Sequence, residues 1–522
     1  MSLSVAAILA ESARRRPDHP AIVFGPASLS YAELWLAARR YAAVLRAHGI
    51  GPGDRVVLIL PNTPHFPMAY YGALALGATV VPVPTLLRAA EIAHVLRDCD
   101  AAAVICAAPL LDRLGESAAT PVFTVLEAGD SGRPRLDVLA AQQIPIDAQV
   151  PRDPRDIALI LYTSGTTGLP KGAMLTQLNI VLNVEIGMDS PFAMEPGDVL
   201  LGCLPLFHTF GQICGMHTVF RAGATMVLME RFDGPRALDL MTARRCTVFM
   251  GVPTMYLALL AATPHRPLPR LDRAFSGGSA LPVRVLEEFQ ARFDCPIYEG
   301  YGLTETSPVV AYNQRAWPCK PGTVGKPIWG VDAEIARADI DDRIELLPPK
   351  TVGEIVIRGH NVMAGYLNRP EATAEAIVDG WFRSGDLGVK DAEGYLSLVD
   401  RKKDMIIRGG YNVYPREVEE VLMRHPAIAQ AAVIGIPDDT YGAEVCAVVV
   451  PDPDADDRDQ LAADIIAWSR KHLAAYKYPR QVRLVESLPL GPTGKVLKRE
   501  LATFLGNAER YAADLGVTKP VS

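Results

Sequence analysis

The alternation of apolar and polar residues divides the first part of the chain into short strands and helices. Apolar runs at 55–60, 78–82, 101–107 and 121–126 predict strands, and the segment 64–77 predicts a buried helix. Strands separated by helices of this length are typical of βαβ units, in which the strands are parallel. We therefore predict a doubly wound α/β sheet in this region.

The same pattern returns after a polar, proline-containing connection at 130–156. An apolar, strand-like segment at 157–161 follows the connection, and from residue 198 the predicted strands lie at 199–204, 225–228, 247–251 and 273–276. Because these strands again alternate with helical segments, they predict a second doubly wound sheet in the same large domain.

The pattern of apolar and polar residues changes beyond residue 320. Short predicted strands at 353–358 and 395–399 indicate a β-rich subdomain, and the charged, glycine-containing stretch 399–415 looks like a joint. A compact α+β unit follows, with predicted elements at 415–424 (helix), 429–435 and 444–450 (strands), 459–473 (helix) and 480–484 (strand). We predict an N-terminal domain at 1–400 and a small α+β domain at 405–522.

Composition and charge exclude several classes of protein. The 522 residues are 49% hydrophobic and 21% charged, and the net charge of −7 argues against a general nucleic-acid binder. No apolar run approaches the ~18 residues of a membrane span, and the basic residues near the N-terminus follow the apolar stretch, the wrong order for a secretory signal. The eight cysteines are scattered, without CxxC spacing. Reduced thiols in a cytoplasmic monomer or homodimer are the expectation.

The stretch YTSGTTGLPKG, which begins at Tyr162, has the composition of a polyphosphate-binding loop. Glycines let backbone N–H groups approach an anion, hydroxyls add small donors, and lysine supplies a compact positive charge. The candidate ligands are Thr163, Ser164, Gly165, Thr166, Thr167, Gly168 and Lys171. The P-loop of NTP hydrolases needs GxxxxG followed by Lys and Ser or Thr, a spacing that this stretch lacks. A kinase or GTPase is therefore disfavoured.

A second candidate segment is the turn SGGSALP, which begins at Ser276 between a predicted strand and a predicted helix. Ligands of doubly wound sheets bind at the carboxyl ends of strands. The small residues Gly278, Ser279 and Ala280 leave room there for a flat base or an acyl chain.

A third segment, EGYGLTETS from residue 299, combines an aromatic ring with a carboxylate. Tyr301, flanked by Gly300 and Gly302, is predicted to expose its ring for stacking on adenine. Thr304 can donate a hydrogen bond to a phosphate oxygen. Glu305 offers the hard oxygen ligand that Mg²⁺ prefers.

Three more residues have weaker signals when each is taken alone. Asp386, after a glycine turn in WFRSGDL, can accept hydrogen bonds from both ribose hydroxyls. His208, in LPLFHTFG, lies at an apolar strand end, where a histidine is usually structural. Lys495, in LPLGPTGKVLKR, lies in a charged tail, where a lysine is usually solvated.

Five motifs in this order, from about residue 10 to residue 505, resemble the adenylate-forming superfamily of acyl-CoA synthetases, adenylation domains and luciferases. The likeness is greatest to fatty acyl-CoA ligases. The resemblance implies a ligase that uses ATP, Mg²⁺ and coenzyme A. It also implies that Lys171 and its loop hold the β and γ phosphates, that Glu305 and Thr167 hold the metal, and that the segment beginning at Glu299 binds adenine.

The resemblance implies further roles for residues of the second half of the chain. Asp386 and Arg401 would bind the ribose, and His208 would form a gate between the acyl pocket and the thiol entrance, without a metal role. Lys495 would bridge the substrate carboxylate and the α-phosphate. The C-terminal domain would be a mobile lid with its hinge at 401–404, centred on Lys403.

Rotation of this lid would replace one set of residues by another in the active site. The segment presented to pantetheine would consist of Arg408, Gly409, Gly410 and Tyr411. Glycines there would let coenzyme A pass close to the backbone.

The segments expected to line the acyl pocket contain no Lys or Arg. They are 204–215, 251–255, 276–280 and 300–312. A second carboxylate would need a cationic partner, which disfavours dicarboxylic acids, and no acidic residue is placed to bind an amino group. A medium- or long-chain fatty acid is the leading expectation, and an aryl or terpenoid acid is the alternative.

Two other functions stay open from the sequence. One is an acyl-AMP ligase that loads the phosphopantetheine of a carrier protein. The other is a non-catalytic binding protein, which should have lost Lys495 or Glu305, and both residues are present.

Overall fold

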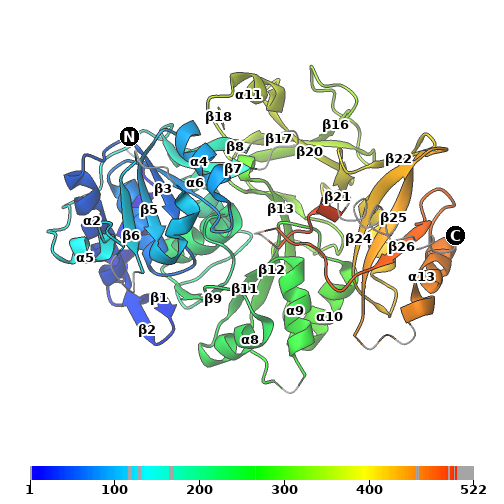
Figure 1. Cartoon of the computed structure of the whole chain (residues 1–522), viewed down its shortest axis with the longest axis horizontal. Coiled ribbons are helices and arrows are strands. Elements are labelled where there is room, and N and C mark those ends of the chain that lie inside the picture. Colours follow the sequence, from blue (N-terminus) through cyan, green and yellow to red (C-terminus); the bar gives the residue numbers. More distant parts are fainter. Residues whose placement is uncertain are drawn as a thin grey trace.

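Two large sheets form most of the N-terminal domain, and a smaller sheet covers one end of them (Figure 1). The computed structural model describes residues 3–115, 120–126, 131–163, 170–264, 266–453, 455, 458–491, 494–498 and 500–501. Among these residues, no helix is both long enough and apolar enough to cross a membrane.

The first sheet contains, in the described residues, seven strands in the order β18-β8-β7-β4-β3-β5-β6. Its strands are β3 (Arg55–Ile59), β4 (Thr79–Pro82), β5 (Ala101–Ala107), β6 (Val122–Val125), β7 (Ile157–Thr163), β8 (Lys171–Thr176) and β18 (Gly365–Tyr366). The strands β7, β4, β3, β5 and β6 are parallel, whereas β8 and β18 are antiparallel additions at one edge. The parallel core matches the predicted doubly wound sheet.

The second sheet has nine described strands in the order β15-β14-β13-β12-β11-β9-β10-β1-β2. These are β1 (Pro20–Phe24), β2 (Ala27–Ser30), β9 (Val199–Gly202), β10 (Thr225–Leu228), β11 (Val248–Gly251), β12 (Arg273–Ser276), β13 (Ile297–Gly302), β14 (Val309–Tyr312) and β15 (Lys326–Pro327). The run from β1 to β13 is parallel, and it confirms the second predicted sheet.

Helices cover the faces of these two sheets. They are α1 (Ala6–Arg15), α2 (Tyr31–Ala47), α3 (His65–Ala75), α4 (Ala89–Asp98), α5 (Leu136–Ala141), α6 (Gln177–Asp189), α7 (Thr218–Ala222), α8 (Gly234–Ala243), α9 (Pro253–Ala262) and α10 (Val283–Phe293). Helix α3 is the buried helix predicted at 64–77. Short 3₁₀ segments η1 (Ala108–Leu114) and η3 (Thr304–Thr306) and a π-helix, η2 (Phe210–His217), complete the domain.

The β-rich subdomain has five described strands. They are β16 (Val331–Ala336), β17 (Gly353–Gly359), β19 (Ile377–Val378), β20 (Trp381–Lys390) and β21 (Leu396–Arg401), with helix α11 (Pro370–Ala376) beside them. All described pairings in this sheet are antiparallel, and the sheet confirms the predicted β-rich subdomain.

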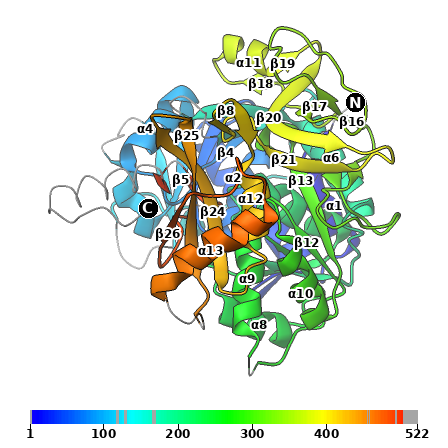
Figure 2. The same cartoon turned by 90° about the vertical axis from the view of Figure 1, so that its right-hand side faces the viewer.

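The C-terminal unit is a three-stranded sheet, in the part of it that is described, with helices on one face (Figure 2). Its elements are β24 (Ile428–Asp438), β25 (Gly442–Pro451), β26 (Gln481–Leu484), α12 (Pro415–Leu422) and α13 (Arg458–His472), preceded by the hairpin of β22 (Ile406–Arg408) and β23 (Tyr411–Val413). These are the helices and strands predicted for the α+β unit, within a few residues.

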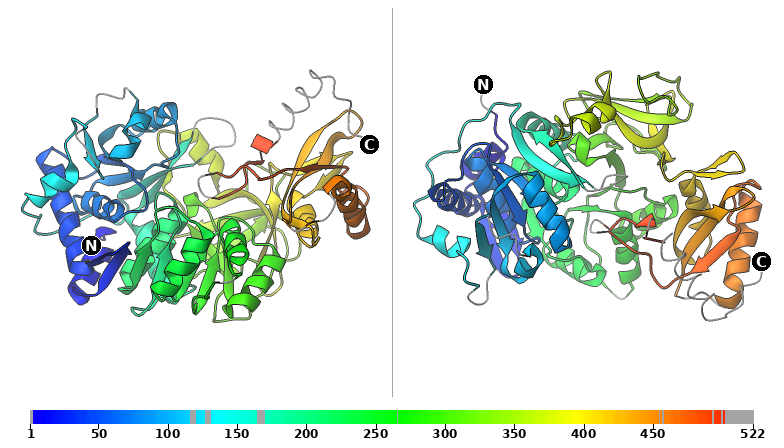
Figure 3. Two further views of the ribbon diagram at one scale, coloured as in Figure 1. Left: turned by 60° about the horizontal axis from the view of Figure 1, so that its bottom comes forward. Right: turned by 45° about the horizontal axis from the view of Figure 1, so that its top comes forward.

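The segment that follows β26 leaves its own unit and returns over the large domain (Figure 3). Thr254 Oγ1, in α9, donates to the carbonyl oxygen of Gly494 over 3.4 Å. Arg284 Nη2, in α10, donates to the carbonyl oxygen of Ile428 over 3.3 Å. The first turns of α9 and α10 are therefore part of the surface on which the C-terminal unit docks.

A buried ion pair anchors β12, the strand that leads into the glycine turn at 277–278. The Arg273 guanidinium donates to both carboxylate oxygens of Asp198 and to the carbonyl oxygens of Phe192 and Ala193. The two charged side chains are only 5% and 7% exposed. All these donors and acceptors are paired, so removal of one partner would leave the other buried charge uncompensated.

We expect Arg273→Met to lower the free energy of unfolding by about 3 kcal/mol, because it leaves the Asp198 carboxylate buried without its cation. Chemical denaturation measures this change. Arg266→Met is the matched control, since Arg266 pairs with Asp239 at the surface, and it should leave the midpoint nearly unchanged. Equal effects of the two substitutions would contradict the assigned role of the buried pair.

Candidate active site

The predicted phosphate loop joins two antiparallel strands at the edge of the first sheet. Thr163 ends β7, Lys171 begins β8, and the two residues face one another in the register of the sheet. Ser164, Gly165, Thr166, Thr167 and Gly168 lie outside the described residues, so their predicted contacts, including Thr167 as a metal ligand, stay predictions.

Glu305 lies directly beside this loop, in η3. Its side chain is buried, and its Oε1 accepts hydrogen bonds from Thr163 Oγ1 and Tyr366 Oη, each over 3.0 Å. Lys171 Nζ is 5.3 Å from the centre of the Tyr366 ring. The carboxylate and the cation predicted to act on the phosphates are therefore brought to the same place.

Tyr366 is a member of this cluster that the sequence motifs missed. It belongs to β18, which pairs with β8 and so brings residue 366 next to Lys171. Burial and the Glu305 carboxylate raise the pKa of Tyr366, which keeps its hydroxyl a donor. The pairing with β8 is a long-range contact, and the surrounding sequence, MAGYL, contains no charged residue that would have drawn attention to it.

The residues around Glu305 fit Mg²⁺ held mainly by substrate phosphates. Among the described residues, no group of three His, Cys, Asp or Glu side chains could enclose a metal ion. Magnesium commonly takes one or two protein carboxylates and completes its shell with phosphate oxygens and water. The buried Glu305 carboxylate, fixed by two hydroxyls beside the phosphate loop, suits that use.

A second polar cluster joins the β-rich subdomain to the second sheet. Asp386, in β20, faces Arg401, in β21, and Asp386 Oδ1 lies 3.2 Å from Arg401 Nε. Tyr301 Oη donates to Asp386 Oδ2 over 2.7 Å. The aspartate carboxylate raises the pKa of Arg401, so the guanidinium stays charged. The three residues predicted for adenine and ribose thus lie together.

The Tyr301 ring is not exposed in the way that its flanking glycines suggested. It lies in strand β13 and is 7% exposed, with its hydroxyl held by Asp386. The prediction of an open ring was wrong because Gly300 and Gly302 serve close packing instead: a Cβ on Gly300 would lie 2.1 Å from the Tyr312 ring. Stacking of adenine on Tyr301 stays a prediction, as does the contact of the half-buried Thr304 with phosphate.

The glycine turn after β12 has one residue that needs glycine's conformational freedom. Gly278 has a φ of +84°, and a Cβ there would lie 3.7 Å from Lys495 Cε. Ser279 is exposed and Ala280 is half-buried beside it. The turn is therefore open on the side that faces Lys495.

Glu299 is hydrogen-bonded to the backbone just after the glycine turn at 277–278. It is 2% exposed, and its Oε1 accepts a hydrogen bond from the Leu281 backbone N–H over 3.0 Å. Burial raises its pKa to about 7. We therefore revise its predicted role from nucleotide contact to the positioning of residues 278–281.

Lys495 reaches this site from the C-terminal unit. The Gly491 N–H donates to the Lys495 carbonyl oxygen over 2.8 Å, and Lys495 Cε lies beside Gly278. Burial and the neighbouring Arg401 lower the pKa of Lys495 to about 8, against the opposing effects of Asp386 and Glu305. The lysine therefore lies within electrostatic reach of both polar clusters.

His208 and Lys495 line the same small cavity, of about 10 Å³. Its other lining residues are Leu204, Pro205, Phe210, Gly211, Val252 and Gly278. Burial, and next the Lys495 cation, lower the pKa of His208 to about 3, so its imidazole is neutral. Because Nδ1 accepts the Phe210 backbone N–H over 3.3 Å, the ring proton is on Nε2. The predicted role of His208 as a gate beside the acyl pocket stays a prediction.

The residues predicted to meet pantetheine are not brought to this cavity. Arg408, Gly409, Gly410 and Tyr411 form the hairpin of β22 and β23, on the outer edge of the C-terminal unit (Figure 1). Tyr411 is 60% exposed and stacks on Tyr476, with ring centres 4.8 Å apart. The Arg408 guanidinium is held by Glu444 over 2.6 and 2.8 Å.

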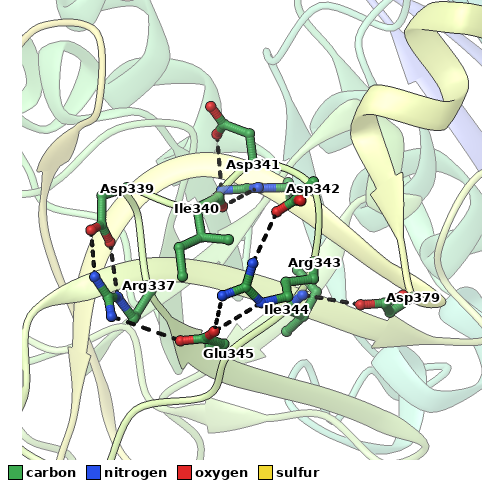
Figure 4. Close-up of polar contacts among 10 residues, drawn as sticks. Arg337, Asp339, Ile340, Asp341, Asp342, Arg343, Ile344, Glu345 and Asp379 are labelled. Carbon is green, nitrogen blue, oxygen red and sulfur yellow. Dashed lines mark hydrogen bonds and ion pairs between the residues drawn. The ribbon is translucent and has the colours of Figure 1, made fainter.

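A loop of the β-rich subdomain, whose polar contacts are shown in Figure 4, lies beside the predicted hinge. In this loop, pairs such as Arg337 with Asp339 fix the backbone, and Arg383 Nη1 donates to the Ile340 carbonyl oxygen over 2.6 Å. The Asp341 carboxylate then lies 3.0 Å from Lys402 Nζ. Lys403, the next residue, is exposed and contributes to the lowered pKa of Lys495.

Comparison with known proteins identifies the family to which this arrangement belongs. The AMP-binding enzyme family matches residues 9–367, and the AMP-binding enzyme C-terminal domain matches residues 417–495. A long-chain-fatty-acid–CoA ligase of Bacillus subtilis is 36% identical over 95% of this chain and 93% of its own. A feruloyl-CoA synthase of an Amycolatopsis species is 38% identical, over 95% and 97%.

Solved structures agree with the sequence relatives. A benzoate CoA ligase from Burkholderia xenovorans LB400 superposes with a TM-score of 0.88 at 30% identity, over 96% of this chain and 99% of that one. The matches span nearly the whole of each protein, including the docked C-terminal unit. The chain therefore belongs to the AMP-binding enzyme family and is an acid–CoA ligase of the adenylate-forming superfamily.

Proposed function

We propose that this enzyme joins a hydrophobic monocarboxylic acid to coenzyme A through an acyl-adenylate. The observation that carries the proposal is the position of Lys495, which enters the large domain next to Gly278 and His208 and within reach of Asp386 and Glu305. Adenine and ribose are assigned to Tyr301, Asp386 and Arg401, and the β and γ phosphates to Lys171 and its loop.

In the first half-reaction, a substrate carboxylate oxygen attacks the α-phosphorus of ATP, and the bond to pyrophosphate breaks. Lys495 holds the carboxylate and the α-phosphate together, because an ammonium group screens two anions that must approach one another. Glu305, with Thr167 as predicted partner, would hold Mg²⁺, which supplies positive charge to the departing pyrophosphate. Neutral His208 offers an Nε2 proton at the wall of the cavity without adding charge.

In the second half-reaction, the coenzyme A thiolate attacks the acyl carbon, and AMP leaves. This step requires the β22–β23 hairpin at the site, so the C-terminal domain must rotate about residues 401–404, with the contact between Lys402 and Asp341 at the pivot. Gly409 and Gly410, both with positive φ, give the hairpin a backbone turn without side chains. The phosphopantetheine of a carrier protein is an alternative acceptor. Transfer of the acyl group to it would use the same geometry.

The acid is a monocarboxylate, because Lys495 is the cation at the cavity among the described residues and is already assigned to the reacting carboxyl group. Two classes of acid suit an apolar pocket. The fatty-acid class has support from the pocket composition and from the Bacillus relative, whose name states that substrate. An aryl acid has support from the aromatic side chains Phe210 and Tyr312 around Gly277, and from the feruloyl-CoA synthase relative. We favour the aryl acid.

Replacing Lys495 should separate the two half-reactions. Lys495→Ala is expected to reduce pyrophosphate release at least 100-fold, because the cation acts on the transition state of adenylation. Thioester formation from supplied acyl-adenylate should be largely retained. Lys498→Ala, on the same segment but paired with Glu419, should keep adenylation. Equal loss of both half-reactions in Lys495→Ala would contradict the two-conformation mechanism.

The pH dependence of adenylation should report the charge of Lys495. Its pKa is lowered to about 8, and the ammonium form is the active one. The kcat/KM of pyrophosphate exchange, measured without coenzyme A, should therefore be constant below this pKa and fall as the pH rises through it. Lys495→Arg should lose this alkaline limb, since a guanidinium does not titrate in the range. A wild-type profile that stays flat to pH 10 would oppose the assignment.

Tyr366 should affect the metal requirement through Glu305. Tyr366→Phe removes a hydrogen bond to the Glu305 carboxylate, so we expect the Mg²⁺ concentration for half-maximal pyrophosphate release to rise about tenfold. Tyr162→Phe is a matched control, because Tyr162, in β7, donates to Asp98 at the end of α4 and not to Glu305. An unchanged Mg²⁺ titration in Tyr366→Phe would remove Glu305 and its partner from the metal site.

A further inference from the structure

We infer that Tyr312 is the residue that selects the acid, and that its phenolic hydroxyl binds an oxygen substituent at the end of an aryl acid remote from the carboxyl group. This inference rests on the proposed function, since it names the substrate class of the same site. The preferred substrate is then a hydroxy- or alkoxy-substituted aryl monocarboxylic acid.

The Tyr312 ring is held in one position by its surroundings. Tyr312 ends β14 and faces Gly300 in the register of the sheet, where a Cβ would lie 2.1 Å from the ring. The rings of Phe192 and Phe275 contact it edge to face, with centres 5.3 and 6.1 Å away. Glycine on one side and aromatic rings on the others leave the phenol little freedom to turn.

The Tyr312 hydroxyl lies next to the wall of the cavity that holds Lys495. A Cβ on Gly277 would lie 3.4 Å from Tyr312 Oη and 3.3 Å from the Phe210 ring. Phe210 and the adjacent Gly278 line the cavity together with Lys495. Gly277 and Gly278 therefore lie between Lys495 and this hydroxyl, with Phe210 beside them.

The Tyr312 hydroxyl forms no hydrogen bond with another described residue, and its oxygen keeps some accessible surface although the residue as a whole is only 3% exposed. Other buried tyrosines are satisfied by backbone carbonyls: Tyr256 Oη donates to Phe275 over 2.8 Å, and Tyr395 Oη donates to Pro318 over 2.6 Å. A buried phenol usually finds such a partner, because leaving it unpaired costs the desolvation of the group. A substrate oxygen would supply the missing partner.

The same surroundings favour a ring over an alkyl chain. Phe192 and Phe275 contact each other and the Tyr312 ring, so an alkyl chain that extended past the Tyr312 hydroxyl would meet aromatic side chains held by their neighbours. A flat acid can lie against Gly277 and Gly278, which present no side chains. Burial raises the pKa of Tyr312, and this keeps the phenol neutral and able to donate.

The test compares 4-hydroxycinnamate with cinnamate as substrates for pyrophosphate release by the full chain. Wild-type enzyme should prefer the hydroxylated acid, by about tenfold or more in kcat/KM. Tyr312→Phe should lose this preference by a fall in kcat/KM for 4-hydroxycinnamate alone, with cinnamate nearly unchanged. Tyr298→Phe is the matched control and should keep the wild-type preference. Tyr298 is also a buried tyrosine, and its ring centre lies 5.6 Å from that of Phe275.

Several results would overturn the inference. An equal fall for both acids in Tyr312→Phe would mean that the hydroxyl serves packing and not recognition. Faster activation of octanoate than of either aryl acid by the wild-type enzyme would remove the aryl class while leaving the ligase mechanism intact. Absence of pyrophosphate release with every acid would instead reject the proposed function itself. Unchanged thermal unfolding of Tyr312→Phe checks that the variant is folded.

Discussion

The constraint on which the structure depends is the placement of one lysine of the C-terminal unit inside the large domain. Lys495 is held near Arg401 and Lys403, and burial together with these cations makes its ammonium form less stable, as its lowered pKa records. Anionic groups would relieve this unfavourable charge. Asp386 and Glu305 do so in part, and the phosphates of ATP would complete it. Docking of the C-terminal unit and binding of an anionic substrate therefore favour one another.

The ends of the strands determine where Lys495 lies relative to the other polar groups of the site. Parallel strands β9, β11 and β12 end on the same side of the second sheet, and the segments that follow them carry His208, Val252 and Gly278. At the edge of the first sheet, β7 and β8 carry Thr163 and Lys171 toward Glu305. The Asp386 and Arg401 pair joins these two sets from the β-rich subdomain. Three sheets thus contribute polar groups to the proposed nucleotide site.

Much of this could be predicted from the sequence, since short apolar runs identified the parallel strands and compact motifs identified the charged groups. What could not be predicted depends on contacts between distant segments. Tyr366 joins Glu305 only because β18 pairs with β8, and Glu299 faces inward because the turn above it needs an acceptor for the Leu281 N–H. Glycines beside Tyr301 suggested an open ring, whereas Gly300 makes room for the Tyr312 ring and Gly302 for the Pro308 backbone. A glycine in the sequence can indicate a position without room for a side chain. It does not identify the residue that packs against that position.

The most direct measurement is a crystal structure of the enzyme with a non-hydrolysable acyl-adenylate analogue. The account predicts that Lys495 Nζ lies within hydrogen-bond distance of the phosphate-like group, with adenine beside Tyr301 and ribose on Asp386. An adenylate bound away from the segment 163–171, or a Lys495 side chain that points into solvent while the analogue is bound, would contradict it.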